Sequence, residues 1–174
     1  IVAIPAAADA GNVAVIVHAD GTETVIPMSL VEGGKAIVKL DGDETIKIVD
    51  NAKDFSDVPA GSYYASALAT AKALGIATAD ANGNFRPTEG VTRQDAMVFL
   101  YRAMQKANRT VPNAYDSYLT RFPDGASVAT DARPAMAAMA QAGVIKGDQV
   151  GRLNPQGTLT RAEMAVILHR GLTL

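Results

Sequence analysis

The sequence contains no cysteine, which excludes disulfide bonds, zinc–thiolate sites and a cysteine nucleophile. It also lacks a hydrophobic run long enough to cross a bilayer as a helix, so we expect no membrane insertion. Neither sign of charge dominates, because the formal net charge is −2, and we expect no broad attraction to nucleic acid. Aromatic residues make up only 5% of the chain, so small aliphatic side chains must fill most of the core.

The sequence does contain a β-rich stretch at residues 1–50. Turn signals such as Asp20-Gly21 and Asp41-Gly42-Asp43 separate short apolar or alternating runs. We predict about four strands in hairpin succession, at residues 13–17, 23–26, 36–40 and 44–49. A sheet of this size needs a partner surface. We therefore interpret it as a meander docked on the rest of the chain, or as the end of a β-sandwich in a longer protein.

The remaining two thirds of the chain carry one pattern twice, at a spacing of 68 residues. Gly75 recurs as Gly143, Thr92 as Thr160 and Arg93 as Arg161. A fixed period indicates tandem units that pack against each other. We predict a first repeat at residues 54–105, a polar linker at 106–118 and a second repeat at 119–174.

Each repeat is predicted to be a helix–loop–helix unit, which makes the fold class α+β, and we expect the two repeats to pack as a helical bundle. The four predicted helices span about 63–74, 92–104, 130–142 and 160–170. Gly75 and Gly143 stand where helix C-caps would lie. A turn and a short extended piece, Phe85-Arg86-Pro87 or Leu153-Asn154-Pro155, connect the helices of each repeat.

These residues resemble the surface-layer homology family, whose pattern runs from Phe-x-Asp-Val through a glycine-bounded turn to Thr-Arg-Ala-Glu. The second repeat matches at residues 143–147 and at Thr160-Arg161-Ala162-Glu163, and the first at Phe55-Ser56-Asp57-Val58. The resemblance implies an extracellular module of the bacterial cell envelope that binds secondary cell-wall polymers, often carrying pyruvate ketals. Members usually have three repeats in a pseudo-threefold arrangement, whereas only two are found here.

The helix-start sequence Thr160-Arg161-Ala162-Glu163 has a structural and a functional interpretation. As a capping box it explains Thr160 and Glu163, and equally Thr92 and Asp95 in the first repeat. It does not explain the arginine, because a cation in the first turn opposes the helix dipole. Arg161 and Arg93 could instead bind a carboxylate of the ligand, or Arg161 could pair with an acid such as Asp124.

Other candidate ligand-binding residues follow the same resemblance. Gly147 has Ala79 as its counterpart in the first repeat. If this position needs a positive φ or the close approach of a sugar, alanine is a poor substitute, so the groove at the second repeat is expected to bind better and Arg161 to matter more than Arg93. We interpret Asp57 and Asp124 as local turn-formers that could also reach sugar hydroxyls. The pair Tyr63 and Tyr64 should place one ring in the core and one on a sugar face. The full set is Arg161, Thr160, Gly147, Gly143, Asp124, Arg93, Thr92, Gly75, Asp57 and Tyr64.

The sequence shows no nucleophile–base pair and no phosphate-binding glycine loop, and His18 and His169 lack a metal-ligand spacing. We therefore predict neither an enzyme nor a cofactor or metal site. The expected function is non-covalent anchoring through an anionic, possibly pyruvylated, cell-wall polysaccharide. The alternative is an assembly or spacer module without its own ligand. We also expect self-association, with the β segment as the competing cover for the alanine-rich first helices.

Overall fold

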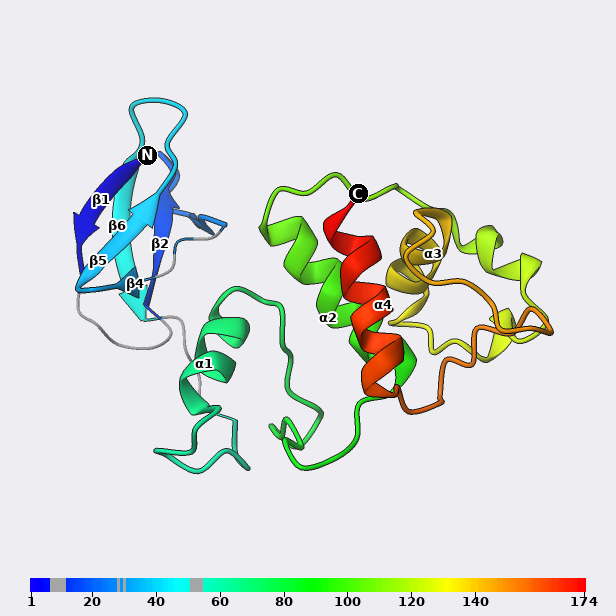
Figure 1. Ribbon diagram of the computed structural model, residues 1–174. Coiled ribbons are helices and arrows are strands. Elements are labelled where there is room, and N and C mark those ends of the chain that lie inside the picture. Colours follow the sequence, from blue (N-terminus) through cyan, green and yellow to red (C-terminus); the bar gives the residue numbers. More distant parts are fainter. Residues whose placement is uncertain (7–11, 28, 30, 51–54) are drawn as a thin grey trace. The chain divides into compact units, whose positions relative to one another are not determined.

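The computed structural model describes residues 1–6, 12–27, 29, 31–50 and 55–174. It divides into two compact units, Ile1–Thr88 and Glu89–Leu174 (Figure 1). The boundary falls inside the first repeat, between its two helices. The α+β fold class is confirmed, whereas the packing of both repeats into a single bundle stays a prediction.

The first unit contains two antiparallel three-stranded sheets, with strand orders β1-β5-β4 and β3-β2-β6. The strands are β1 (Val2–Pro5), β2 (Asn12–Val17), β3 (Glu23–Val25), β4 (Val31–Glu32), β5 (Lys35–Val38) and β6 (Thr45–Asp50). The four predicted strands are present, and β2 and β3 form the predicted hairpin. The predicted hairpin of β5 with β6 is wrong, because these strands belong to different sheets. The sequence analysis missed β1 and β4, which are short and carry no clear alternation.

Strand β2 is covered on both faces, which explains its uninterrupted apolar sequence. Ala14 lies in a cluster shared with Ala36 and Val38 of β5, so the two sheets have a common core. Val13 and Val15 face the other way and pack against the end of helix α1 (Ala65–Ala73). The β segment therefore supplies part of the cover for α1, for which the sequence analysis had favoured a second copy.

The second unit has one core around the helices α2 (Arg93–Lys106), α3 (Arg133–Gln141) and α4 (Arg161–Leu172). Two 3₁₀ segments, η1 (Asp116–Arg121) and η2 (Gly125–Ser127), precede α3. Helix α3 packs on α2, and α4 contributes Ile167 to the same core and places Gly171 beside Leu100 and Met104 of α2 (Figure 1). The largest fully buried side chains of this core are Met97, Leu119, Met136, Met139, Ile145, Leu153 and Ile167.

The ends of the helices follow local signals unequally. Gly75 and Gly143 follow the C-caps of α1 and α3 with φ of +70° and +74°, so their prediction as helix caps is confirmed. Both of these helices begin two or three residues later than predicted. At their N-cap residues, Tyr64 and Ala132, no side chain hydrogen-bonds to the helix start. The sequence therefore has no capping signal that would mark where these two helices begin.

Candidate functional site

The two second helices begin at threonine N-caps, as predicted. Thr160 and Glu163 form a complete capping box: the Glu163 amide donates to Thr160 Oγ1 at 3.2 Å, and the Thr160 amide donates to Glu163 Oε2 at 2.9 Å. Thr92 likewise accepts from the Asp95 amide at 3.2 Å. Its own amide is not bonded to Asp95, whose side chain is one methylene shorter.

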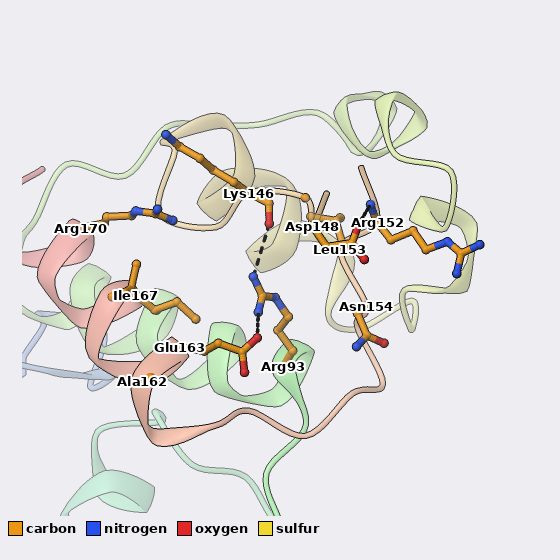
Figure 2. Close-up of a pocket in the computed structure, with 12 residues that line it drawn as sticks. Arg93, Lys146, Asp148, Arg152, Leu153, Asn154, Ala162, Glu163, Ile167 and Arg170 are labelled. Atoms are coloured by element: carbon orange, nitrogen blue, oxygen red, sulfur yellow. Dashed lines mark hydrogen bonds and ion pairs between the residues drawn. The ribbon is translucent and has the colours of Figure 1, made fainter. Parts of the chain in front are cut away.

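Arg93 stands just after the Thr92 cap and reaches across to the second repeat (Figure 2). Its Nη1 donates to Glu163 Oε1 at 3.2 Å and its Nη2 to the Lys146 carbonyl at 3.4 Å. The side chain is only 15% exposed. Its Nε is buried and has no hydrogen-bond partner among the described residues, so the site contains a donor that still lacks an acceptor.

Arg93 lies in a groove of about 390 Å³ that joins parts of both repeats. The first repeat contributes the start of α2, and the second contributes the turn that follows α3 and one side of α4. The lining residues are Arg93, Lys146, Gly147, Asp148, Arg152, Leu153, Asn154, Ala162, Glu163, Val166, Ile167 and Arg170.

The groove carries more positive than negative charge, although the chain as a whole is slightly acidic. Four lining side chains are cations and two are carboxylates. Amide donation from Arg152 and Val150 lowers the pKa of Asp148. The Thr160 amide, the Thr160 hydroxyl and Arg93 lower the pKa of Glu163. Both carboxylates are therefore ionised and already bonded, and the excess cations remain for an anion.

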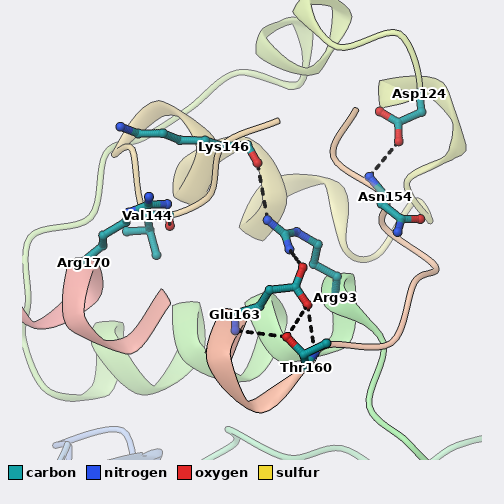
Figure 3. A network of polar contacts seen from close by, with 8 residues as sticks. All are labelled: Arg93, Asp124, Val144, Lys146, Asn154, Thr160, Glu163 and Arg170. Carbon is teal, nitrogen blue, oxygen red and sulfur yellow. Dashed lines mark hydrogen bonds and ion pairs between the residues drawn. The ribbon is translucent and has the colours of Figure 1, made fainter. Parts of the chain in front are cut away.

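Two of the cations are positioned differently from Arg93. Arg170 Nη1 donates to the Val144 carbonyl at 3.4 Å and so ties α4 to the segment after α3 (Figure 3). The Arg152 guanidinium points away from Arg93 (Figure 2). Arg93 is thus the cation that the groove holds most closely, between a carboxylate and a carbonyl.

Gly147 is required by the shape of the turn. A Cβ at this position would lie 2.7–2.9 Å from backbone atoms of Gly151, closer than real contacts allow. The φ of Gly147 is not in the left-handed region, so the suggestion of a positive φ is wrong. The sequence analysis also allowed for close approach of a sugar, but the close approach in the structure is to Gly151.

Asp57 and Asp124 do not act as local turn-formers, and that interpretation is wrong. Asp124 accepts the amides of Leu153 and Asn154 at 2.9 and 2.7 Å, 29 and 30 residues along the chain. Asp57 accepts the amides of Phe85 and Arg86 in the same way, and these bonds lower its pKa. Each carboxylate thus joins the start of a repeat to the segment before its second helix.

The predicted extended pieces are also wrong at their central residue. Arg86 and Asn154 have φ of +60° and +51°. This left-handed residue turns two successive amides toward one carboxylate, Asp57 or Asp124. The bonds offset the conformational cost of positive φ.

The remaining predicted site residues lie apart from the groove or at its edge. Arg161 is exposed and contacts no acid among the residues that the structure describes, so the predicted pairing with Asp124 is not formed. Thr92, Thr160 and Gly143 are close in sequence to the lining but do not line it. Gly75, Asp57 and Tyr64 belong to the unit Ile1–Thr88.

The prediction that one of the two tyrosines is a core residue is wrong. Tyr63 is 97% exposed, and Tyr64 is half-buried. Their rings meet edge to face with centroids 5.0 Å apart. The more exposed ring is therefore Tyr63, not the selected Tyr64.

The sequence analysis missed Lys146, Arg152 and Arg170 as groove residues and treated Glu163 only as a cap. The 68-residue repeat spacing identifies which residues of the two repeats are equivalent. The groove, however, combines the helix start of the first repeat with the turn of the second, and these are not equivalent positions. Arg93 and Lys146, which are 53 residues apart, meet only when the two repeats pack.

No described helix is long and apolar enough to be a candidate membrane span. Across the same described part of the chain, no cluster of three or more His, Cys, Asp or Glu residues could hold a metal ion.

Comparison with known families gives a match to the S-layer homology domain at residues 54–97 and 121–165. The chain therefore belongs to the S-layer homology domain family, as its motifs had indicated. Domains of this family are non-catalytic modules that anchor surface proteins to the bacterial cell wall. The predicted location at the surface of the cell envelope is confirmed by this membership.

Curated relatives carry the same region within much longer proteins. The chain is 32% identical over 116 residues to an amylopullulanase of Thermoanaerobacterium thermosulfurigenes and 33% identical over 116 residues to exoglucanase XynX of Acetivibrio thermocellus. It is 32% identical over 121 residues to S-layer protein EA1 of Bacillus anthracis. Each match covers 67% of this chain but only 6%, 10% and 12% of these relatives, respectively.

Proposed function

We propose that the chain anchors its surface protein non-covalently by binding an anionic secondary cell-wall polysaccharide in the Arg93 groove. The observation that carries the proposal is the Arg93 Nε, a buried donor without a partner among the described residues. An unpaired buried donor costs free energy, and an oxygen of the ligand would remove that cost. The cations of the lining support an anionic ligand.

A carboxylate is the ligand group that fits the arginine best. A guanidinium can hold a carboxylate through two parallel hydrogen bonds, which an ammonium cannot do. Both Nη atoms of Arg93 already donate to protein oxygens at 3.2 and 3.4 Å, so the edge that carries Nε is proposed to face the ligand. A pyruvate ketal on a sugar would present such a carboxylate.

The other predicted residues receive roles around this contact. Gly147 keeps the turn close to Gly151, Thr160 holds Glu163 against Arg93, and Asp124 fixes the wall at Leu153. Thr92, Gly143 and Arg161 remain candidates for contacts at the edge of the groove. Asp57, Gly75 and Tyr64 remain candidates for a separate contact in the first unit.

Calorimetric titration with purified wall polymer tests the proposal. We expect Arg93→Ala to lower the affinity at least about tenfold, because it removes a charge-assisted hydrogen bond. Arg109→Ala removes an exposed arginine that does not line the groove, and this matched control should leave the affinity nearly unchanged. Arg161→Ala should lower the affinity less than Arg93→Ala, which reverses the order expected from the sequence, since Arg161 does not line the groove. Arg93→Lys should also bind weakly, because lysine keeps the charge but not the paired donors.

Comparison of pyruvylated with de-pyruvylated polymer tests the carboxylate. Equal binding of the two forms would exclude a carboxylate contact while leaving polysaccharide binding intact. No binding of either form would favour the alternative, an assembly or spacer module without its own ligand. Self-association, which the sequence also leads us to expect, stays a proposal and concerns a surface outside this groove.

A further inference from the structure

Helix α4 exposes an apolar stripe made of Ala165, Leu168 and Leu172, which we call the α4 stripe. Leu168 is 46% and Leu172 72% exposed, and Ala165 is exposed as well. The three residues are spaced for one face of a helix. Apolar residues gathered on one face of a capped, well-formed helix indicate a surface that another element covers.

The repeat shows how an equivalent stripe is covered. Shifted by 68 residues, the α4 stripe corresponds to Met97, Leu100 and Met104 of α2. Met97 and Met104 are buried and Leu100 is half-buried, all in the core of the second unit. Helix α2 obtains this cover from the second repeat, which packs its first helix, α3, on α2 and places Gly171 of α4 beside Leu100 and Met104.

The part of α3 that enters this core corresponds to a part of α1 that stays less covered. Ala135, Met136 and Met139 of α3 are buried. Their counterparts are Ala67, which is exposed, and Leu68 and Ala71, which are partly exposed. These three residues form what we call the α1 face.

Strand β2 does not occupy the α1 face. It packs against Ala73 and Leu74 at the end of α1. Their counterparts in α3 are Gln141, which is exposed, and Ala142, which is half-buried. The α1 face is therefore a first-helix surface of the same kind as the one that covers α2.

We propose that the α4 stripe docks on the α1 face of a second copy of this chain, as α2 docks on α3 within one copy. Arg161 supports the same arrangement. It is exposed and has no partner among the described residues, whereas its counterpart Arg93 reaches the turn that follows α3. Docking of a second copy would bring its turn at residues 78–80, the counterpart of 146–148, to Arg161. The second copy would thus complete a second groove.

The association is head-to-tail, because the two surfaces of the interface are different. Light scattering on the 174-residue chain should give a mass that rises above 18.1 kDa as the concentration increases. Leu168→Glu with Leu172→Glu should weaken the association at least about tenfold, since each glutamate would be buried without a partner. Tyr115→Glu with Val150→Glu is the matched control: it adds the same charge at exposed apolar residues outside α4 and should leave the association unchanged.

A mixing experiment separates this interface from a symmetric one. Ala67→Glu with Ala71→Glu alters the α1 face and should also give a monomer. Mixed with the α4-stripe variant, it should form a complex of twice the monomer mass, because one intact α4 stripe then meets one intact α1 face. Circular dichroism on each variant checks that the helices are retained.

A wild-type mass that stays at 18.1 kDa at all concentrations would overturn the proposal. So would association that survives the α4-stripe variant, or a mixture that remains monomeric. The experiment contains no polysaccharide, so its outcome is independent of the ligand proposed for the Arg93 groove.

Discussion

Glu163 serves two purposes with its two oxygens. Oε2 accepts the Thr160 amide and completes the cap of α4, and Oε1 accepts from Arg93 of the first repeat. One carboxylate therefore links the start of a helix to the cation that stands in the groove. The equivalent residue of the first repeat, Asp95, accepts the Thr92 hydroxyl at the start of α2 but does not line the groove, so the two carboxylates allow the groove contact to be compared directly.

The lowered pKa of Glu163 predicts a pH dependence of stability. The folded state binds the proton more weakly than the unfolded state, whose pKa is near 4.5. The contribution of Glu163 to stability is therefore complete above pH 4.5 and is lost as the pH falls through its lower folded pKa. Glu163→Gln can still cap α4, and we expect its free energy of unfolding to fall less steeply with acid. Urea titrations at about pH 6 and about pH 3.5 measure this. Asp95→Asn is the matched control, because it makes the equivalent substitution in the first repeat. If the free energy of unfolding of Glu163→Gln fell with acid as steeply as that of Asp95→Asn and wild type, the prediction would be contradicted.

At the scale of the element, the sequence predicted best what is decided within a few residues. The threonine N-caps of α2 and α4 and the glycines after α1 and α3 lie where they were expected, because each cap depends on one side chain or one φ angle. The strand order was not predictable in this way. Strand β6 pairs with β2 across more than twenty residues, and no local signal distinguishes that pairing from a hairpin with β5.

The cap of α4 should contribute more to stability than the arginine beside it. Thr160→Ala removes the hydroxyl that accepts the Glu163 amide, although the backbone amide of residue 160 can still donate to Glu163, and should cost about 1 kcal/mol of the free energy of unfolding. Arg161→Ala removes an exposed cation that opposes the helix dipole, so we expect a change close to zero or slightly stabilising. Urea unfolding of the two variants side by side measures the difference. A large loss from Arg161→Ala would show that this arginine has a structural partner.

The sequence predicted that an arginine and a turn glycine belong to the site, but it did not predict which repeat supplies each of them. The recurring arginine indicated an anion site, and Arg93 and Gly147 do lie together in the groove. The choice of Arg161 over Arg93 followed from assigning each arginine to the turn of its own repeat. In the structure the guanidinium of one repeat meets the turn of the next, because repeats pack through different surfaces at their two sides.

At the scale of the whole molecule, two separate sets of buried residues indicate two units that unfold separately. The clusters around β2 and α1 contain only residues of Ile1–Thr88, and the methionine-rich core contains only residues of Glu89–Leu174. The family match at residues 54–97 nevertheless spans the boundary. The sequence repeat and the folding unit are therefore different divisions of this chain.

The carboxylates Asp57 and Asp124 allow this division to be tested with a matched pair of substitutions. Each accepts two backbone amides inside one unit, and removing either carboxylate should destabilise that unit, since hydrogen bonds to a charged group are lost. We expect Asp124→Ala to raise amide hydrogen exchange within residues 89–174 and leave residues 1–88 unchanged, and Asp57→Ala to do the opposite. Hydrogen-exchange mass spectrometry resolves the two halves, and the exposed Asp131→Ala serves as a control for the loss of an acid. If either substitution raises exchange across the whole chain, the two units unfold as one, and the boundary at Thr88 and Glu89 separates two packing clusters within a single cooperative structure.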